Sequence, residues 1–295
     1  MERKKTGLTI IELLIVLGII AILVGLLVPS LSAVKKMAKE TKQKAQFSTI
    51  EMALIAFKND DGDYPPSANN IGDYCGSQKL AEALLGWDLL GFHPNSDFTS
   101  NGTNGAGVFV YDNSDTVLFG QRKGPYLEQA TTNAFTLGSI FWNGTGSLEA
   151  NTHVICDVFN TATARLPNGT TMKAGTPVLY YKANPSSKSM NPAGPAEFVN
   201  QIYNANDNMA LINLGSPPPD SRAHKLGDDD GIFDPTPPFS GYSGTGEYFY
   251  NSLYKIRDPK ITARAWPYRP DSYILISAGA DGLYGTPDDI CNFGN

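Results

Sequence analysis

The sequence predicts an α+β protein, in which a long N-terminal helix precedes a β-rich head with irregular insertions. The helix is indicated by an apolar run over residues 8–28, after which apolar residues continue at helical spacing to Asn59. The head is indicated by composition, because 29 Gly, 20 Pro, 14 Tyr and 14 Phe suit turns and strands better than a helical bundle. With 295 residues, the chain is long enough for one sizeable domain with appendages. We expect a short basic stretch over residues 1–7, the helix over residues 8–59 and the head over residues 60–295.

Residues 8–28 have the length and composition of a transmembrane helix. Thr9 and Glu12 are the only conspicuously polar residues in this run, and about 20 apolar residues are enough to span a bilayer. The preceding sequence MERKKTG is basic, so we expect the N-terminus in the cytoplasm and the head across the membrane. A cleaved signal peptide is the alternative, because Ser-Leu-Ser followed by Ala33 offers a weak signal-peptidase site. That alternative leaves Glu12 unexplained, so a single-pass anchor is preferred.

The basic stretch and the first residues of the helix resemble a known processing signal. A basic leader that ends in Gly7, followed by LTIIE and a long apolar helix, is similar to the N-terminus of type IV pilins and type II secretion pseudopilins. The resemblance implies that a prepilin peptidase cleaves between Gly7 and Leu8 and that Leu8, the new N-terminus, is methylated. Glu12 becomes the fifth residue of the mature chain. The first mature residue in this family is more often Phe, so Leu8 is a departure.

Glu12 places a carboxylate inside the predicted membrane span, where an unpaired charge is costly. Cleavage creates a second charge at the same depth, the amine of Leu8. A neighbouring subunit offers each charge a partner, because Glu12 of one copy can face the Leu8 amine of the next. We therefore expect this pair to set the register of an assembling fibre. The alternative is a Glu12 side chain that extends to the nearby membrane surface.

The helix is expected to continue beyond the membrane into the head, with Pro29 kinking or loosening it. Its later turns carry apolar residues at helical spacing, namely Leu31, Val34 and Ala38, and then Ile50, Ala53, Leu54 and Phe57. Five lysines over residues 35–44 lie between these sets, and we expect them either in solvent or against acidic surfaces of neighbouring heads. One Gly and two Pro residues in KNDDGDYPPS end the helix. The run ALIAFKNDDGDYPP resembles the same junction in the major pseudopilin.

The head is expected to contain short elements separated by long loops. Short helices are predicted over 77–90 and 196–203, strands over 108–111, 153–159, 178–182 and 272–277, and hairpin-type turns at 143–144 and 168–169. The pieces KGPYLE, AGTPVLYYKA and DSYILISAGADG resemble, in order, pieces of the conserved core sheet of the major pseudopilin. This resemblance implies an antiparallel sheet packed on the end of the long helix. Residues 67–122, 129–172 and 184–270 are then insertions, and residues 215–246 are predicted to be irregular.

A glycine-rich acidic stretch near the C-terminus, SAGADGLYGTPDDI, predicts a calcium loop. Glycines let the backbone curl so that carbonyls and carboxylates converge, and Ca²⁺ takes six to eight oxygen ligands. The stretch resembles the calcium-binding segment of the major pseudopilin, which implies Asp281 and Asp288 as side-chain ligands, then Asp289, with the carbonyl of Ala278. A surface cluster of Asp-Gly turns is the alternative. The second acidic stretch, GDDDGIFD over residues 227–234, is expected to be a solvated loop.

Charge and motif content argue against several function classes. The net charge is −6 although the first 44 residues are basic, so the head is acidic and nucleic acid is not expected as its partner. Cys75, Cys156 and Cys291 form no CxxC pair, which argues against zinc, and they are compatible with one disulfide and one odd thiol. The three His residues lie in no catalytic or metal spacing, and no phosphate loop or nucleophile motif is present, so no enzyme is expected.

The resemblance therefore implies a structural subunit of a pilus-like fibre, closest to the major pseudopilin of a type II secretion system. Its expected partners are further copies of itself, other pseudopilins, a prepilin peptidase, an inner-membrane assembly platform and the membrane. The head is expected in the periplasm. One alternative is a type IV pilin-like subunit for adhesion, motility or DNA uptake. The other is a membrane-anchored module that binds glycans or proteins through aromatics such as Trp87 or Trp266.

Overall fold

The computed structural model describes residues 9–68, 73–128, 132–188, 190, 201–219, 222, 224, 226 and 256–294, without the side chains of residues 26–30 and 32. The chain divides into two units, one ending at Lys42 and one running from Gln43 to Asn295, and each is considered by itself. The second unit is the head. It holds all strands and all helices of the described part except the N-terminal portion of the first helix.

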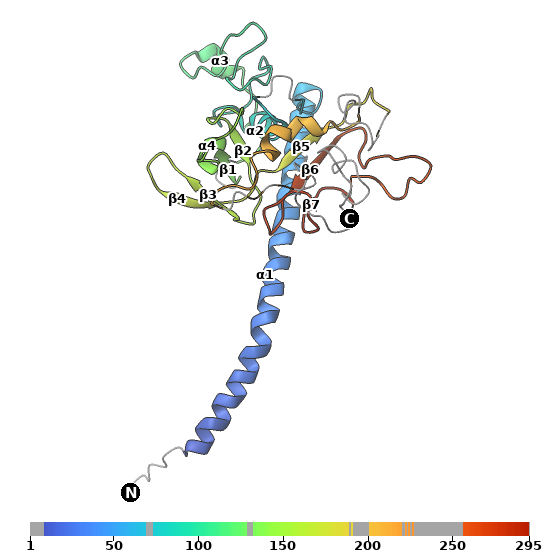
Figure 1. Cartoon of the computed structure of the whole chain (residues 1–295). Coiled ribbons are helices and arrows are strands. Elements are labelled where there is room, and N and C mark those ends of the chain that lie inside the picture. The colour runs from blue at the N-terminus through green and yellow to red at the C-terminus, as the bar shows by residue number, and fades with distance from the viewer. Residues whose placement is uncertain are drawn as a thin grey trace. The chain divides into compact units, whose positions relative to one another are not determined.

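Helix α1 (Ile10–Asp61) confirms the long N-terminal helix and continues without interruption through position 29 (Figure 1). It ends two residues later than predicted, where Gly62 adopts φ +94° and its N–H donates to the Lys58 carbonyl at 2.8 Å. Among the helices of the described part, none is long and apolar enough to cross a membrane.

A three-stranded antiparallel sheet forms the centre of the head, in the order β5 (Leu179–Lys182), β6 (Tyr273–Ser277) and β7 (Ile290–Cys291). Leu179 pairs with Ile276, and Ile276 pairs with Cys291 on its other side. The strands predicted at 178–182 and 272–277 are therefore confirmed. KGPYLE, by contrast, contributes no strand, because only an isolated bridge between Phe92 and Lys123 forms there.

Two further antiparallel pairs flank this sheet, β1 (Ala134–Thr136) with β2 (His153–Ile155), and β3 (Ala162–Arg165) with β4 (Thr171–Ala174). The turn at 168–169 joins β3 to β4 as predicted, whereas the turn at 143–144 lies in the long connection between β1 and β2. The strand predicted over 153–159 is shorter than expected. The one predicted over 108–111 is wrong, since that segment forms only an isolated bridge between Thr103 and Phe109.

Short helices complete the head: α2 (Gly76–Leu85), α3 (Thr116–Gly120), α4 (Leu137–Ile140), the 3₁₀ helix η2 (Ala205–Asn208) and α5 (Met209–Ile212). Helix α2 is shorter than the predicted 77–90, because Gly86 at φ +94° ends it and Cys75, not Ser77, occupies the N-cap position. Of the helix predicted over 196–203, residues 196–200 lie outside the described residues and residues 201–203 are not helical.

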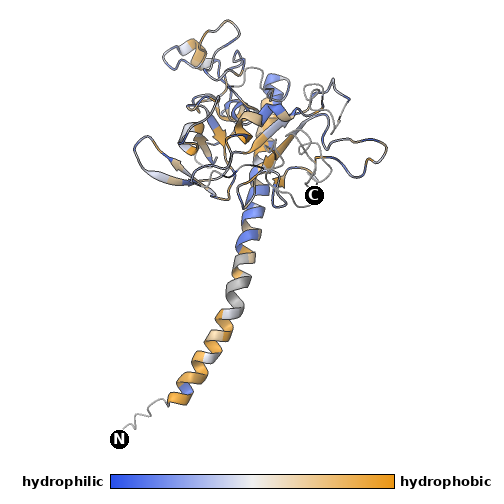
Figure 2. Ribbon diagram, viewed as in Figure 1, coloured by the Kyte–Doolittle hydropathy of each residue, from blue (hydrophilic) through white to orange (hydrophobic). Residues whose placement is uncertain are grey.

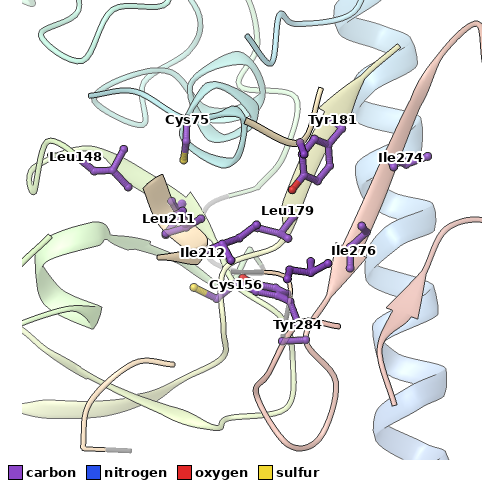
Figure 3. Close-up of a cluster of buried hydrophobic side chains, with 14 of the residues drawn as sticks. Cys75, Leu148, Cys156, Leu179, Tyr181, Leu211, Ile212, Ile274, Ile276 and Tyr284 are labelled. Atoms are coloured by element: carbon purple, nitrogen blue, oxygen red, sulfur yellow. The ribbon is translucent and has the colours of Figure 1, made fainter. Parts of the chain in front are cut away.

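The central sheet separates two hydrophobic clusters, because alternate residues of β5 and β6 face opposite sides. Leu179, Tyr181, Ile274 and Ile276 belong to the cluster that includes β1, β3 and α5 (Figure 3). Tyr180, Tyr273 and Leu275 belong to the other cluster, which contains α2 and the buried face of α1. This second cluster joins the helix to the sheet.

None of the three cysteines forms a disulfide, although the sequence allowed one; Cys75 and Cys156 are buried and Cys291 is partly buried. Residues 227–234, predicted as a solvated acidic loop, lie outside the described residues.

Candidate functional site

The N-terminal site centres on Glu12, whose carboxylate caps its own helix. Gly7 and Leu8, the predicted cleavage position, lie outside the described residues. The backbone N–H and the hydroxyl of Thr9 both donate to Glu12 Oε2 at 2.8 Å. In return, the Glu12 N–H donates to the Thr9 hydroxyl oxygen at 3.3 Å. This reciprocal arrangement is a capping box, a role for Glu12 that sequence reasoning missed although T-x-x-E is its signature.

The first turns of α1 are apolar on every face. Its large hydrophobic side chains from Ile10 to Val24 are each between 50% and 80% exposed, and Figure 2 shows hydrophobic residues all along this part of the helix. A helix that is hydrophobic all round is normally surrounded by other apolar groups. Such a surface favours lipid or neighbouring helices over water.

Within the head, α1 has two different faces. Phe47, Ile50, Leu54 and Phe57 lie at most 2% exposed in the core. On the other side, Ala45, Ser48, Met52 and Ile55 follow one another at spacings of three and four residues and are exposed. A stripe of small and apolar residues with this spacing suits close approach by another helix.

The C-terminal loop over residues 277–290 is held by hydrogen bonds to its own aspartates. Asp288 Oδ2 accepts from the backbone N–H groups of Ala280 at 2.7 Å and Asp281 at 3.0 Å. Asp281 Oδ1 accepts from the Leu283 N–H at 2.8 Å, and Asp289 Oδ2 accepts from the Gly285 N–H at 2.9 Å. These bonds bring the carboxylates of Asp281 and Asp288 to one end of the loop.

Electrostatics distinguish these two carboxylates. Burial, and then the negative charge of Asp288, raises the pKa of Asp281. Burial also acts to raise the pKa of Asp288, but hydrogen bonds from the Thr286 hydroxyl and from Asp281 and Ala280 outweigh it and lower that pKa. The negative charges of two neighbouring carboxylates repel each other. A divalent cation bound between such carboxylates cancels this repulsion.

Residues from the insertions clamp the loop from outside. The Arg222 guanidinium donates to the Asp281 carbonyl at 2.8 Å, and His224 Nδ1 accepts from the Tyr284 N–H at 3.0 Å. Burial lowers the pKa of His224 to about 4, so this ring is neutral at pH 7. At the base of the loop, the Ser277 hydroxyl donates to the buried Asp157 at 3.0 Å. Sequence reasoning missed these contacts, because Asp157, Arg222 and His224 all lie in the insertions.

The loop offers oxygen donors that suit calcium, although its carboxylates are few. Within the described residues, no three His, Cys, Asp or Glu side chains converge in a way that could hold a metal ion. A calcium site here therefore rests on Asp281 and Asp288 with backbone carbonyls, and Ala278 is buried at the loop's start. Gly279, at φ +69°, permits the narrow turn, since an added Cβ atom would collide with the Asp288 carbonyl oxygen.

A second site missed by sequence reasoning is a buried carboxylate on α2. Glu82 is 1% exposed and accepts hydrogen bonds from the hydroxyls of Tyr74 at 2.7 Å, Ser96 at 2.5 Å and Tyr111 at 2.8 Å. Burial raises the pKa of Glu82. This hydroxyl cluster ties α2 to residues before and after it in the same insertion, residues 67–122.

Comparison with known proteins finds similarity to curated proteins of one name, type II secretion system core protein G. The chain is similar to type II secretion system core protein G of Dickeya chrysanthemi, with 32% identity over 72 residues, or 24% of this chain and 47% of that protein. The protein of the same name from Vibrio cholerae is 36% identical over 69 residues, covering 23% and 47% of the two chains. The Escherichia coli protein of that name is 36% identical over 89 residues, covering 30% and 61%.

The resemblance to the major pseudopilin is thus confirmed over about a quarter of the chain. The chain spans about half the length of the curated relatives it matches. No protein-family model matches the chain, and no solved structure matches it.

Proposed function

We propose that this chain is a subunit of a type II secretion pseudopilus, cut between Gly7 and Leu8, methylated at Leu8 and assembled through α1. In this proposal residues 8–28 cross the inner membrane before assembly, and the head lies in the periplasm. The similarity to type II secretion system core protein G carries the proposal. The capped helix with an apolar surface on every side supports it.

The apolar start of α1 supplies the driving force for membrane insertion and fibre assembly. Removal of a Leu, Ile or Val side chain from water contributes about 1.5–3 kcal/mol. The large apolar side chains from Ile10 to Val24 are at least half exposed, so lipid before assembly and neighbouring copies afterwards are favourable surroundings. The exposed stripe that contains Met52 and Ile55 offers a further helix-packing surface on the head.

Glu12 then has two partners, Thr9 within its own chain and the Leu8 amine of a neighbour. Both hydrogen bonds from Thr9 end on Oε2, so the capping box leaves Oε1 available to a donor from another subunit. The capping box holds the carboxylate near the helix start, where the amine of the next subunit approaches it. The charge pair stabilises only the staggered register that brings the Glu12 carboxylate and the Leu8 amine together.

Mass spectrometry of the mature N-terminus tests the processing step. The full chain is co-produced with a prepilin peptidase, and the expected N-terminal peptide begins at methylated Leu8. Substitution of Gly7 by Val should leave the leader in place, because the resemblance places the cut directly after this glycine. An intact leader on the unsubstituted chain, or a new terminus at Ala33, contradicts the proposal.

Two variants of Glu12 separate the charge pair from the helix cap. Glu12→Gln keeps a capping-box residue but removes the charge, whereas Thr9→Val keeps the charge but removes the hydroxyl that completes the cap. We expect Glu12→Gln to reduce incorporation into sheared fibres strongly and Thr9→Val to reduce it only slightly. If Glu12→Gln is incorporated like the unsubstituted chain, the charge pair has no role.

We also propose that the loop over residues 277–290 binds calcium, with Asp281 and Asp288 as side-chain ligands, Asp289 as a further carboxylate and the Ala278 carbonyl beside them. The positive charge of the ion offsets the repulsion between the carboxylates of Asp281 and Asp288. By binding both, the ion links the C-terminal segment to the head. Its expected role is structural.

Thermal unfolding with and without calcium tests this loop. At free calcium about a hundred times Kd, binding adds about 2.7 kcal/mol, or roughly 5–10 °C in a head of this size. Asp281→Asn should abolish that rise. In chelator it should leave the melting temperature unchanged or slightly higher, because a carboxyl with a raised pKa is costly when ionised. Asp97→Asn, an exposed carboxylate elsewhere, is the control. An equal rise in Asp281→Asn and in the unsubstituted chain excludes the site.

A further inference from the structure

The insertion over residues 67–122 presents an exposed apolar surface that the helix and the central sheet do not explain. We define the inserted patch as Leu90, Val108, Phe109, Val117 and Phe119, whose residues are between 41% and 66% exposed. Exposed apolar side chains grouped on one segment of a soluble domain mark an interaction site more often than chance.

The inserted patch is built on ordered backbone. The Asn104 N–H donates to the Val108 carbonyl at 2.9 Å, and the Val108 N–H donates to Asn104 Oδ1 at 2.9 Å, so Val108 and Phe109 sit on a closed turn. Helix α3 carries Val117 and Phe119, and its N-cap Asp115 accepts from the Val117 N–H at 2.8 Å. These apolar side chains are held outward by hydrogen-bonded structure.

A continuous stack joins the two halves of the inserted patch. Phe109 packs edge-on against Trp87 with ring centroids 5.6 Å apart, and Trp87 stacks on Tyr111 at 6.2 Å. The Arg122 guanidinium then lies over the rings of both Tyr111, at 5.1 Å, and Phe119, at 5.2 Å. Asp88 holds that guanidinium through two hydrogen bonds, at 2.8 and 2.9 Å. Phe109 and Phe119 therefore share a base of packed rings and a paired guanidinium.

The surroundings of the inserted patch are acidic. Residues 87–121 contain four aspartates and neither Lys nor Arg. Asp88 is paired with Arg122, whereas Asp97, Asp112 and Asp115 are exposed. A partner that fits this surface combines apolar side chains with positive charge.

The chain itself contains a segment of that chemistry. Leu31, Val34 and Met37 on α1 are 55%, 59% and 65% exposed, and residues 31–44 carry five lysines and a single glutamate. We propose that the inserted patch of one subunit binds residues 31–44 of α1 in a second copy of this chain, apolar on apolar and lysine on aspartate. The proposal rests on the proposed function, since a fibre brings the heads and helices of different copies together.

Photo-crosslinking within assembled fibres tests the contact directly. A photoreactive phenylalanine analogue replaces Val117 in one tagged copy, which is mixed with an isotopically labelled unsubstituted copy, and crosslinked peptides are identified by mass spectrometry. We expect crosslinks from position 117 to labelled residues 31–44. The same analogue at Met172, an exposed apolar residue on β4, is the matched control. Fibres in which position 117 crosslinks elsewhere, or only within its own chain, overturn the proposal.

Charge exchange provides a second, independent measurement. The double variant Asp97→Lys with Asp112→Lys should reduce the crosslink by about tenfold, because like charges then face each other. Lys36→Glu with Lys39→Glu should reduce it similarly, and the combined four-site variant should restore it. Asp97→Asn with Asp112→Asn, which only removes charge, should give a smaller loss. Absence of restoration contradicts the proposal, whereas absence of fibres from the unsubstituted processed chain contradicts the proposed function instead.

Discussion

Two parts of the single helix α1 differ in every respect except their backbone. From Ile10 to Val24 the large apolar side chains lie on all faces and are at least half exposed. From Phe47 to Phe57 the apolar side chains alternate between a face buried in the head and an exposed face. The pattern of side chains, and not the helical backbone, therefore determines which surroundings each part of α1 needs.

The physical consequence is a division of roles along one element. The later part of α1 gains its free energy inside its own chain, by packing against α2, β5 and β6 in the second cluster. The large apolar side chains of the early part stay at least half exposed within their own chain, so their further burial requires apolar groups from outside the chain. A substitution in one part should therefore leave the property that depends on the other part unchanged.

The largest expected effect comes from the core face of the later part. Leu54 is fully buried, so Leu54→Ala should lower the free energy of unfolding of the head by about 2–5 kcal/mol. Ile55→Ala is the matched control on the next residue, because Ile55 is 52% exposed. Urea unfolding followed by tryptophan fluorescence measures both. Equal losses at the two positions contradict the two-faced description of this part of α1.

The early part is tested by a charge on its apolar surface. Val16→Lys should weaken membrane partition by about 2.5–3.5 kcal/mol, roughly a hundredfold, because Lys at the centre of a span is disfavoured by that amount. Resistance of the chain to carbonate extraction from membranes measures this loss. Met37→Lys, beyond the predicted span, should have no such effect. If Val16→Lys instead destabilises the head in urea, the two parts are coupled and the comparison is wrong.

The sequence predicted this division because both parts follow simple periodic rules. Residues 8–28 are apolar apart from Thr9 and Glu12, and the later part repeats Ile50, Ala53, Leu54 and Phe57 at helical spacing. The central strands were also predictable, since VLYYK and SYILIS are short apolar runs that now pair as β5 and β6. Such patterns depend only on neighbours in the chain.

The remaining features depend on contacts between residues that are distant in sequence. The sequence around Glu82 did not indicate that the hydroxyls of Tyr74, Ser96 and Tyr111 donate hydrogen bonds to its carboxylate. The strand predicted at residues 108–111 is wrong because hydrogen bonds to Asn104 turn the chain there. Asp281, Asp288 and Asp289 do lie in one loop as predicted. The hydrogen bond from Arg222 to the Asp281 carbonyl, however, joins residues that are 59 positions apart in the sequence. Their calcium binding stays a prediction.

Glu82, like Glu12, is a carboxylate that accepts hydrogen bonds from hydroxyl groups, but Glu82 is buried in the head whereas Glu12 is exposed. Burial raises the pKa of Glu82 above its ordinary value of 4.5, so the folded head retains a proton that the unfolded chain has released. As the pH rises from 4.5 through the raised pKa, the unsubstituted head should lose stability relative to Glu82→Gln. The slope is at most about 1.4 kcal/mol per pH unit.

Urea unfolding of the head and of Glu82→Gln between pH 4 and 8 measures this difference. Other carboxylates titrate equally in both proteins, so only the difference is informative. Glu149→Gln, at a partly buried position outside the hydroxyl cluster, serves as the control for the loss of a carboxylate. A constant difference for Glu82→Gln means that Glu82 has the same pKa in the folded and unfolded chain.

The smallest effect is expected at the polar edge of the later part of α1. Glu51 Oε1 accepts from the Arg269 guanidinium at 2.5 Å and from the Asn292 side-chain amide at 2.9 Å, which links α1 to the C-terminal segment. Glu51→Gln keeps the bond from Asn292 but loses the ion pair, so it should lower the free energy of unfolding by about 0.5–1 kcal/mol. Because both charges are partly exposed, the loss should shrink as salt is raised.

Asp63→Asn, which breaks the more exposed ion pair with Lys182, should lower the free energy of unfolding by still less. A salt-independent loss at Glu51 means that the hydrogen bond, and not the charge, joins this edge of α1 to the head.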